Sequence, residues 1–288
     1  MNCYLCQSDK KERVEGKVRD IPDLSILRCS DCGLVFLESF DHISDTFYEE
    51  AKMRESDPNK PMLEWEKVLN ECCADDQRRA EYVVADIKNK DILDFGCGGG
   101  GFLLKVKDLA GTSAGVEKDR NFRMILQDQQ KLRVFSDLEE IKGAYDYITL
   151  FHVIEHLADP IMILKRLSNF LKPSGSILIE TPNADDALLS LYKNKPFSEF
   201  TYWGPHLFLF NNKTLAKIFE MAGLKINYIK QIQRYPLANH LYWLAKGKPG
   251  GHNVWDFFND NVLNKAYESQ LTKLGKCDTL IASISREI

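Results

Sequence analysis

The residues best suited to chemistry follow an apolar run, where Asp94 precedes a series of glycines at alternate positions. Gly96, Gly98 and Gly100 leave no Cβ between the main chain and a ligand, and they permit backbone angles that other residues resist. A second acid, Glu117, ends the next apolar run. In a strand–helix–strand unit such an acid lies at the end of the neighbouring strand, where carboxylates bind ribose hydroxyls. The pattern predicts a turn that binds a nucleoside-containing cofactor.

Two cofactor classes use this kind of turn, and the acid before it distinguishes them. Gly96, Gly98 and Gly101 also satisfy the G-x-G-x-x-G fingerprint of dinucleotide-binding proteins. Asp94 would repel a pyrophosphate but suits an ammonium group, such as the methionine amine of S-adenosylmethionine. With Glu117 included, the segment resembles motif I and the following acidic strand end of class I S-adenosylmethionine-dependent methyltransferases. A turn that binds nothing is the alternative, but it would cost backbone entropy without a ligand to approach.

The resemblance continues in the family's order over about residues 80–235. Apolar and β-branched residues predict a strand in YDYITLF, and the VIEH segment just past it would lie beneath the cofactor sulfonium. Residues 160–173 predict a helix that buries Leu171 with its other apolar residues, and SILIETPN predicts the fifth strand. An ordered series of motifs is far more specific than any one of them.

The resemblance implies an α/β fold with a Rossmann-like, seven-stranded class I methyltransferase sheet whose last strand is antiparallel. Residues 225–235 and 279–285 are expected to form the antiparallel hairpin that ends this fold. The segment between them, about residues 236–274, is far longer than an ordinary hairpin loop. It predicts a helical cap insertion with aromatic side chains that excludes water from the core.

Cofactor contacts can be assigned from the resemblance residue by residue. The methionine end is expected over Gly96 and Gly98, with its ammonium near Asp94 and the ribose hydroxyls on Glu117. The adenine is expected beside Lys118, next to the strand end at 136–137. The full set of expected cofactor-binding residues is Asp94, Gly96, Cys97, Gly98, Glu117, Lys118, Ser136, Asp137, Phe151 and His152.

A second motif pairs Cys3-x-x-Cys6 with Cys29-x-x-Cys32, separated by 22 residues. Two such hooks supply four thiolates in the tetrahedral cage that suits structural zinc. Disulfides are the alternative, yet the N-terminus lacks the basic and apolar regions of an export signal. We therefore expect a zinc ribbon and a cytoplasmic location. The remaining cysteines show no ligand spacing: Cys72, Cys73, Cys97 and Cys277.

The composition of the chain that carries both motifs is typical of a globular protein. With 288 residues, 44% hydrophobic and 28% charged, the chain can bury one substantial α/β core plus small appendages. We expect the zinc ribbon at 1–40, a helical connector at 41–88 and the methyltransferase domain at 89–288. No apolar run approaches the length of a membrane span, so membrane insertion is not expected.

The charge balance bears on the substrate. The chain has 38 basic and 42 acidic side chains, and residues 1–60 carry nine basic against thirteen acidic ones. Phosphate binding needs an excess of Lys and Arg on one face. Nucleic acid is therefore not the expected partner, although a zinc-ribbon RNA methyltransferase stays an alternative.

The segment after the fifth strand suggests the acceptor. A loop with Tyr202, Trp203 and His206 precedes a helix that begins at NNKTL, an arrangement similar to small-molecule methyltransferases of bacterial sugar pathways. Some of those relatives also carry an N-terminal zinc module. The resemblance implies methyl transfer to a hydroxyl or amine of a sugar or nucleotide-linked sugar. Sugar C-methyltransferases tend to carry Glu directly before this histidine, and Pro205 at that position disfavours carbon methylation.

Three histidines and one tyrosine are the candidate catalytic residues. His206 is the first candidate for the general base, because an imidazole near its ordinary pKa accepts a proton at neutral pH. A structural histidine that ties the loop to the backbone is the alternative. Tyr202 is expected to orient the substrate, and His152 and His156 are rivals for the role of base.

Further residues and functions remain open. A basic group near a Pro-Gly-Gly turn could meet a diphosphate or form a solvated turn: Arg234, His240, Lys246, Lys248 and His252. The LDFGCGGG and VIEHLADP segments also resemble quinone and lipid precursor O-methyltransferases. A non-catalytic zinc-ribbon interaction protein with a relic cofactor fold is the alternative from another class.

Overall fold

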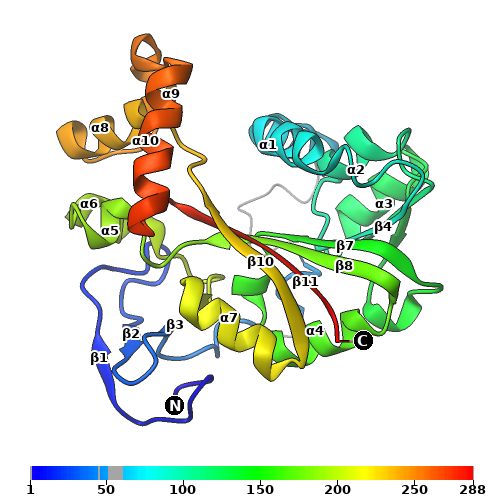
Figure 1. Cartoon of the computed structure of the whole chain (residues 1–288), viewed down its shortest axis with the longest axis horizontal. Coiled ribbons are helices and arrows are strands. Elements are labelled where there is room, and N and C mark those ends of the chain that lie inside the picture. The colour runs from blue at the N-terminus through cyan, green and yellow to red at the C-terminus, as the bar shows by residue number, and fades with distance from the viewer. Residues whose placement is uncertain (1, 45, 51–60, 288) are drawn as a thin grey trace.

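The computed structural model describes residues 2–44, 46–50 and 61–287, and it is built on a seven-stranded sheet (Figure 1). The strand order is β10-β11-β8-β7-β4-β5-β6. β4 to β8 pair in parallel, whereas β11 runs antiparallel to both of its neighbours. The predicted class I methyltransferase sheet is thus confirmed. Its strands are β4 (Asp91–Phe95), β5 (Thr112–Val116), β6 (Arg133–Phe135), β7 (Tyr145–Phe151), β8 (Leu171–Pro182), β10 (Leu224–Ile232) and β11 (Thr279–Arg286).

Helices cover both faces of the sheet, so the central strands are apolar on both sides. The first group, which Figure 1 shows above the sheet, is α1 (Pro61–Val83), α2 (Gly101–Val106) and α3 (Arg120–Asp128). The second group, below the sheet, is α4 (Pro160–Ser168) and α7 (Asn212–Met221). α4 ends before Leu171, which was expected on its apolar face. Leu171 instead begins β8 and pairs with Tyr145 of β7.

The N-terminal segment forms a second sheet together with a strand from far along the chain. Its order is β1-β2-β3-β9, with β1 (Lys11–Arg13), β2 (Ile26–Cys29), β3 (Val35–Leu37) and β9 (Phe208–Leu209). Val35 pairs with Leu209 and Phe36 with Phe208. The buried side chains of this sheet are continuous with those of the main core. The cysteine-bearing segment is therefore packed directly onto the strand that follows His206.

A helical segment lies between β10 and β11 and projects from one end of the sheet (Figure 1). It contains α8 (Leu237–Lys246), α9 (Gly251–Val254), the 3-10 turn η3 (Asp256–Phe258) and α10 (Asn261–Leu274). It packs beside α5 (Ala187–Ser190) and α6 (Lys195–Thr201), where Trp243 contacts Phe197 with ring centroids 5.2 Å apart. Within the described ranges, no helix has the length and apolar character needed to cross a membrane.

Candidate active site

The turn between β4 and α2 has the backbone geometry that its glycines predict. Gly96, Gly98 and Gly100 have φ angles of 76°, 54° and 76°, in the left-handed region that glycine tolerates. A Cβ on Gly96 would lie 2.5 Å from Val153, and one on Gly100 would lie 2.5 Å from Leu126. The turn therefore requires glycine for its conformation and for its close packing.

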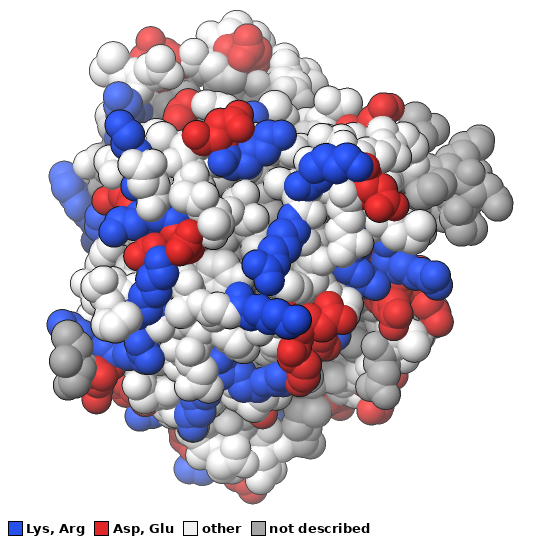
Figure 2. Space-filling view, turned by 90° about the vertical axis from the view of Figure 1, so that its right-hand side faces the viewer, with Lys and Arg blue, Asp and Glu red and all other residues white. Residues whose placement is uncertain are grey.

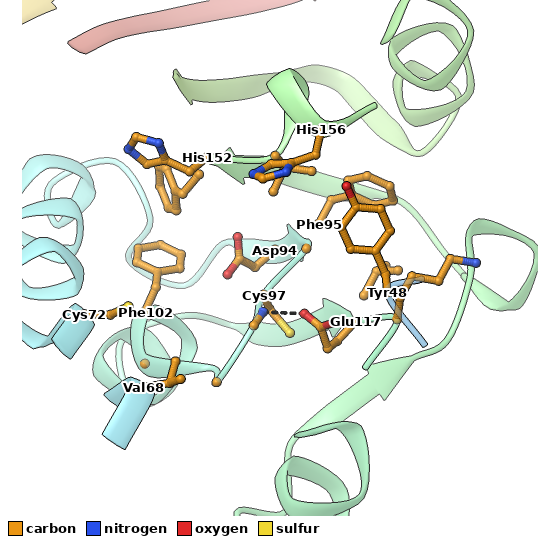
Figure 3. Close-up of a pocket in the computed structure, with 18 of the residues that line it drawn as sticks. Tyr48, Val68, Cys72, Asp94, Phe95, Cys97, Phe102, Glu117, His152 and His156 are labelled. Atoms are coloured by element: carbon orange, nitrogen blue, oxygen red, sulfur yellow. Dashed lines mark hydrogen bonds between the residues drawn. The ribbon is translucent and has the colours of Figure 1, made fainter. Parts of the chain in front are cut away.

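Glu117, directly after β5, closes this turn. One of its carboxylate oxygens accepts a hydrogen bond from the backbone N–H of Gly98, at 2.6 Å (Figure 3). The other accepts one from the backbone N–H of Asp119, at 2.7 Å. The side chain is only 9% exposed and lines a cavity at the carboxyl ends of β4, β5 and β7. This is the edge of a parallel sheet at which ligands bind in open α/β folds.

Asp94 is buried beneath the same cavity. Its carboxyl accepts a hydrogen bond from the Thr149 hydroxyl at 2.7 Å, and its side chain points into the cavity (Figure 3). Burial raises the pKa of Asp94 to about 7, because a lone carboxylate is poorly solvated there. An ammonium group bound at this position would add positive charge beside the carboxyl and favour its ionised form.

The cavity has a volume of about 610 Å³ and brings most of the predicted cofactor residues together. Ser136 is the exception, since its N–H and hydroxyl both bond to Glu140 outside the cavity lining. Lys118 and Asp137 line the cavity as an ion pair. The predicted residues that line it are Asp94, Gly96, Cys97, Gly98, Glu117, Lys118, Asp137, Phe151 and His152.

His152 stands at the end of β7 with a φ of 55°, a left-handed backbone that is unusual for a residue with a side chain. Its Nδ1 lies 3.1 Å from Glu155, and its Nε2 lies 2.9 Å from Nη1 of Arg234. Nε2 also lies 3.3 Å from Oε1 of Glu180. Contacts with Glu155, Arg234 and Glu180 thus fix the orientation of the ring.

The two other predicted histidines contact each other in the lining of the cavity. The ring centroids of His156 and His206 lie 4.9 Å apart, and both residues line the cavity. Burial lowers the pKa of both imidazoles, and that of His206 falls to about 3. Both are therefore neutral at physiological pH. A neutral imidazole can accept a hydrogen bond from a hydroxyl, but with this pKa it holds a proton only weakly.

Tyr202 lies outside this site. Its side chain is 3% exposed and lines a separate cavity of about 440 Å³ together with Arg28. Trp203, the next residue, lines the large cavity and contacts His206 with ring centroids 5.4 Å apart. Successive side chains of an extended backbone point to opposite sides, which explains the difference. Trp203, rather than Tyr202, therefore lines the cavity that contains the glycine turn.

Residues 236–274 do not line the cavity either, although they were expected to cover it. α1 lies there instead. Trp65 donates from Nε1 to the Gly99 carbonyl at 2.9 Å, and Asp76 and Arg79 line the cavity. No motif marked these residues in the sequence, since α1 shows only a charged and apolar helical pattern.

Three of the five expected anion-binding residues already have partners. Arg234 forms two hydrogen bonds to Asp75 of α1, in addition to its bond to His152. His240 is buried, with its Nδ1 2.8 Å from the Tyr267 hydroxyl. Nδ1 of His252 lies 3.3 Å from Oδ1 of Asn239. The other two residues of the expected group are Lys246 and Lys248.

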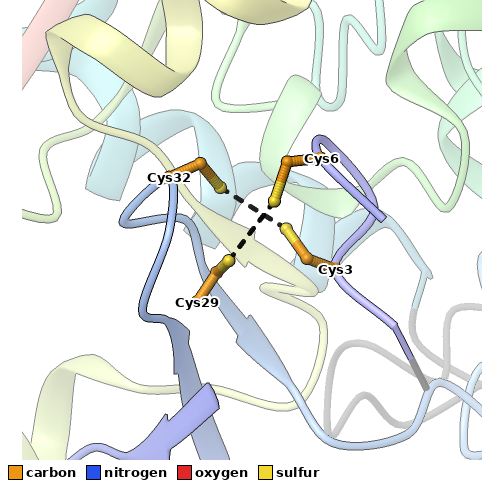
Figure 4. A group of neighbouring side chains, drawn as sticks. All are labelled: Cys3, Cys6, Cys29 and Cys32. Carbon is orange, nitrogen blue, oxygen red and sulfur yellow. Dashed lines mark hydrogen bonds between the residues drawn. The ribbon is translucent and has the colours of Figure 1, made fainter. Parts of the chain in front are cut away.

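The four N-terminal cysteines converge on one point (Figure 4). Sγ of Cys3 lies 3.5 Å from that of Cys32, and Sγ of Cys6 lies 3.4 Å from that of Cys29. All four sulfurs lie within 4.8 Å of one another. Four thiol sulfurs at these distances fit the tetrahedral sulfur set of structural zinc.

The cysteine-bearing segment also holds the loop that presents His206. The guanidinium of Arg19 lies over Trp203, 4.8 Å from its ring centroid. Asp20 accepts a hydrogen bond from the Gly204 N–H at 2.8 Å, and the Leu37 N–H donates to the Leu207 carbonyl at 3.0 Å. The loop is therefore tied to the N-terminal segment on both sides of His206.

Comparisons with known proteins agree with this site. Residues 65–229 match the model of a family described as methyltransferase domain. A ubiquinone biosynthesis O-methyltransferase of Acinetobacter baylyi is 26% identical over 55% of this chain and 73% of its own length. One of Xanthomonas campestris pv. campestris is 29% identical over 39% of this chain, and the match spans about half (52%) of its length.

Among solved structures, the likeness is one of fold. A chain from a complex between the Haloferax volcanii Trm112 methyltransferase activator and a methyltransferase aligns with a TM-score of 0.53 at 14% identity. The alignment covers 77% of this chain and 95% of that one. With the glycine turn, the two acids and the sheet order in place, the family match identifies this chain as a member of the methyltransferase-domain family, a class I S-adenosylmethionine-dependent methyltransferase.

Proposed function

We propose that this protein methylates a hydroxyl of a small molecule, with a sugar as the leading acceptor class. One observation carries the proposal: a single cavity joins the glycine turn and its two acids to the imidazoles of His156 and His206. Trp203 and Tyr48 also line that end of the cavity, and aromatic rings suit the C–H face of a sugar while imidazoles bind its hydroxyls. The relatives named as O-methyltransferases support oxygen as the acceptor atom.

For the cofactor, we propose that Asp94 binds the ammonium of S-adenosylmethionine and that Glu117 binds the ribose hydroxyls. Burial raises the pKa of Asp94 despite the opposing charge of Arg79, and the ammonium would add positive charge beside this carboxyl. The adenine would lie beside Lys118 and Asp137. Ser136 is left out of this proposal because its polar groups are bound to Glu140.

In the proposed reaction the acceptor oxygen attacks the methyl carbon in line with the carbon–sulfur bond. The new O–CH₃ bond forms as the S–CH₃ bond breaks, and its electron pair stays on sulfur. The sulfonium is already activated by its charge, so the protein mainly aligns the acceptor and helps to remove its proton. His206 would accept a hydrogen bond from the hydroxyl, which orients the oxygen.

We also propose that Cys3, Cys6, Cys29 and Cys32 bind one structural zinc ion. Its role would be to hold the N-terminal sheet, and through β3 and β9 the loop that carries Trp203 and His206. The domain boundaries at about residues 40 and 88 stay predictions. Of the predicted connector, residue 45 and residues 51–60 lie outside the described residues.

Nucleic acid is not part of the proposal. The face drawn in Figure 2 carries basic and acidic side chains side by side, without a continuous basic stripe. A diphosphate contact through Arg234 and His240 is also left out, because both already have partners. A sugar without a nucleotide is therefore preferred over a nucleotide-linked sugar.

A phenolic quinone precursor is the second candidate, favoured by the names of the relatives. Methyl-labelled S-adenosylmethionine, offered with free sugars, nucleotide sugars and dihydroxylated aromatic acids, would separate the two. We expect the label on a sugar hydroxyl as an ether. Label found only on phenols would establish the second candidate instead, and cofactor binding without transfer to any hydroxyl would contradict both.

A further inference from the structure

Three side chains at the acceptor end of the cavity lie close enough to share one ion. Glu155, His156 and His206 each offer one ligand atom, and these atoms all lie within 4.8 Å of one another. Glu155 and His156 belong to the 3-10 turn η2 (Ile154–His156) after β7, whereas His206 comes from the loop before β9. The cluster is separate from the four cysteines, which form their own group.

One nitrogen of the His156 ring lacks a partner. In the described part of the chain, its Nδ1 is buried and forms no hydrogen bond. A buried polar atom without a partner is costly, and the lone pair of a neutral imidazole can bind a metal ion.

Glu155 has the anchoring that metal-binding carboxylates show. It is fully buried, and its oxygens accept hydrogen bonds from His152 Nδ1 at 3.1 Å and from the Thr181 hydroxyl at 2.9 Å. These bonds fix the position of the carboxyl group beside the two imidazoles. A carboxylate and two imidazole nitrogens held this close together offer three ligand atoms to a cation.

We propose that Glu155, His156 and His206 bind a divalent first-row transition metal ion, separate from the zinc of the cysteine site. Two imidazoles and one carboxylate are a ligand set that suits Zn²⁺, Fe²⁺, Co²⁺ or Mn²⁺. His156 and His206 line the cavity, with Glu155 buried beside them, so three protein ligands would leave coordination positions open toward the acceptor.

This ion has a role in the reaction, a step that rests on the proposed function. An acceptor hydroxyl bound to the cation becomes more acidic, because the metal stabilises the oxygen's negative charge. The hydroxyl proton leaves to water, the oxygen takes the methyl group, and the S–CH₃ electron pair stays on sulfur. A metal-bound oxygen removes the need for a strong general base, which a buried His206 is not.

Metal content tests the site without any acceptor. The purified full chain, equilibrated with Co²⁺ and desalted, should retain two metal ions per chain by elemental analysis. Cobalt on the cysteines gives thiolate charge-transfer bands in the near ultraviolet, whereas the second site gives only weak visible bands. His206→Gln and His156→Gln should each retain one ion and the thiolate bands, with second-site affinity reduced at least about 10-fold.

The controls separate this result from misfolding and from the proposed function. His252→Gln, far from the cluster along the chain, should keep both ions. Circular dichroism and cofactor calorimetry should show that His206→Gln is folded and binds S-adenosylmethionine as the original protein does. One cobalt ion per chain in the original protein, or two in both cluster variants, would overturn the proposal. Metal content and cofactor affinity can be measured without an acceptor, so they test the metal site even if no methyl transfer is observed. Turnover unaffected by loss of the second ion would overturn its catalytic role.

Discussion

Arg19 of the N-terminal segment stacks on Trp203, with its guanidinium 4.8 Å from the ring centroid, and thereby joins the cysteine site to the acceptor loop. The two residues are 184 positions apart in the chain. The hydrogen bond from Gly204 to Asp20 and the pairing of β3 with β9 add to this contact. The position of His206 therefore depends on a segment whose own fold depends on four cysteines.

Loss of zinc should reduce turnover more than cofactor binding. Cys6→Ser removes one proposed ligand at an exposed position, and the metal-free segment should loosen because thiolate–metal bonds supply much of the folding energy of such a module. Elemental analysis should show the zinc loss, while calorimetry shows nearly unchanged cofactor affinity. Cys72→Ser, another exposed cysteine, is the control and should keep the zinc. Full turnover in zinc-free protein would show that the acceptor loop holds its position unaided.

Glu117→Ala should weaken cofactor binding by about 1.5–3 kcal/mol, the cost of losing a charged acceptor of hydrogen bonds. The substitution also frees the Gly98 N–H, so the turn loses its anchor. Calorimetry measures the affinity directly. Glu139→Ala, on an exposed side chain outside the cavity lining, should leave it unchanged. Equal affinity in Glu117→Ala and the original protein would remove Glu117 from the cofactor site.

Cofactor affinity should increase as the pH rises from about 6 to about 8. Burial raises the pKa of Asp94 to about 7, so the free protein carries a neutral carboxyl below that pH. The cofactor ammonium favours the ionised form, and affinity falls up to about tenfold per pH unit below pH 7. Calorimetry in buffers of different ionisation enthalpy should reveal the released proton.

Asp94→Asn is the control for this pH dependence. Its affinity should be lower and nearly independent of pH until the cofactor amine itself titrates, near about 8. In the absence of cofactor, the raised pKa of Asp94 adds to the free energy of unfolding, and this contribution is fully present below about pH 4. It is lost as pH rises through about 7, because only the folded state favours its proton. The same pH profile in both proteins would contradict the assignment.

His206→Ala should lower the turnover rate by about 10²- to 10⁴-fold with unchanged cofactor affinity, because the acceptor oxygen loses its hydrogen-bonding partner or its metal ligand. His152→Ala should cost less, since that ring is held by Glu155 and Arg234. Tyr202→Phe is the control: its ring faces the other cavity, and turnover should stay within a few-fold. Near-normal turnover of His206→Ala would leave proximity alone as the source of catalysis.

Local patterns in the sequence determined the cofactor turn and the cysteine site. The glycines around position 98 adopt left-handed backbone angles that few other residues tolerate. The Cys-x-x-Cys spacing by itself predicts a pair of metal ligands on a tight turn. The seven-stranded sheet with an antiparallel last strand was implied by the resemblance to class I methyltransferases, whose motifs occur here in the family's order. These features depend on residues close together in the chain.

Tertiary structure decided what the acceptor end contains. Which of Tyr202 and Trp203 faces the cavity depends on the backbone at the end of α6, and Leu171 joined β8 because pairing with Tyr145 outweighed helical periodicity. The hydrogen bonds from Arg78 in α1 to Glu180 in β8 join residues 102 positions apart. The cluster of Glu155 with His206 joins residues 51 positions apart. A short stretch of sequence cannot predict such contacts, because they form only when packing of the core brings distant segments together.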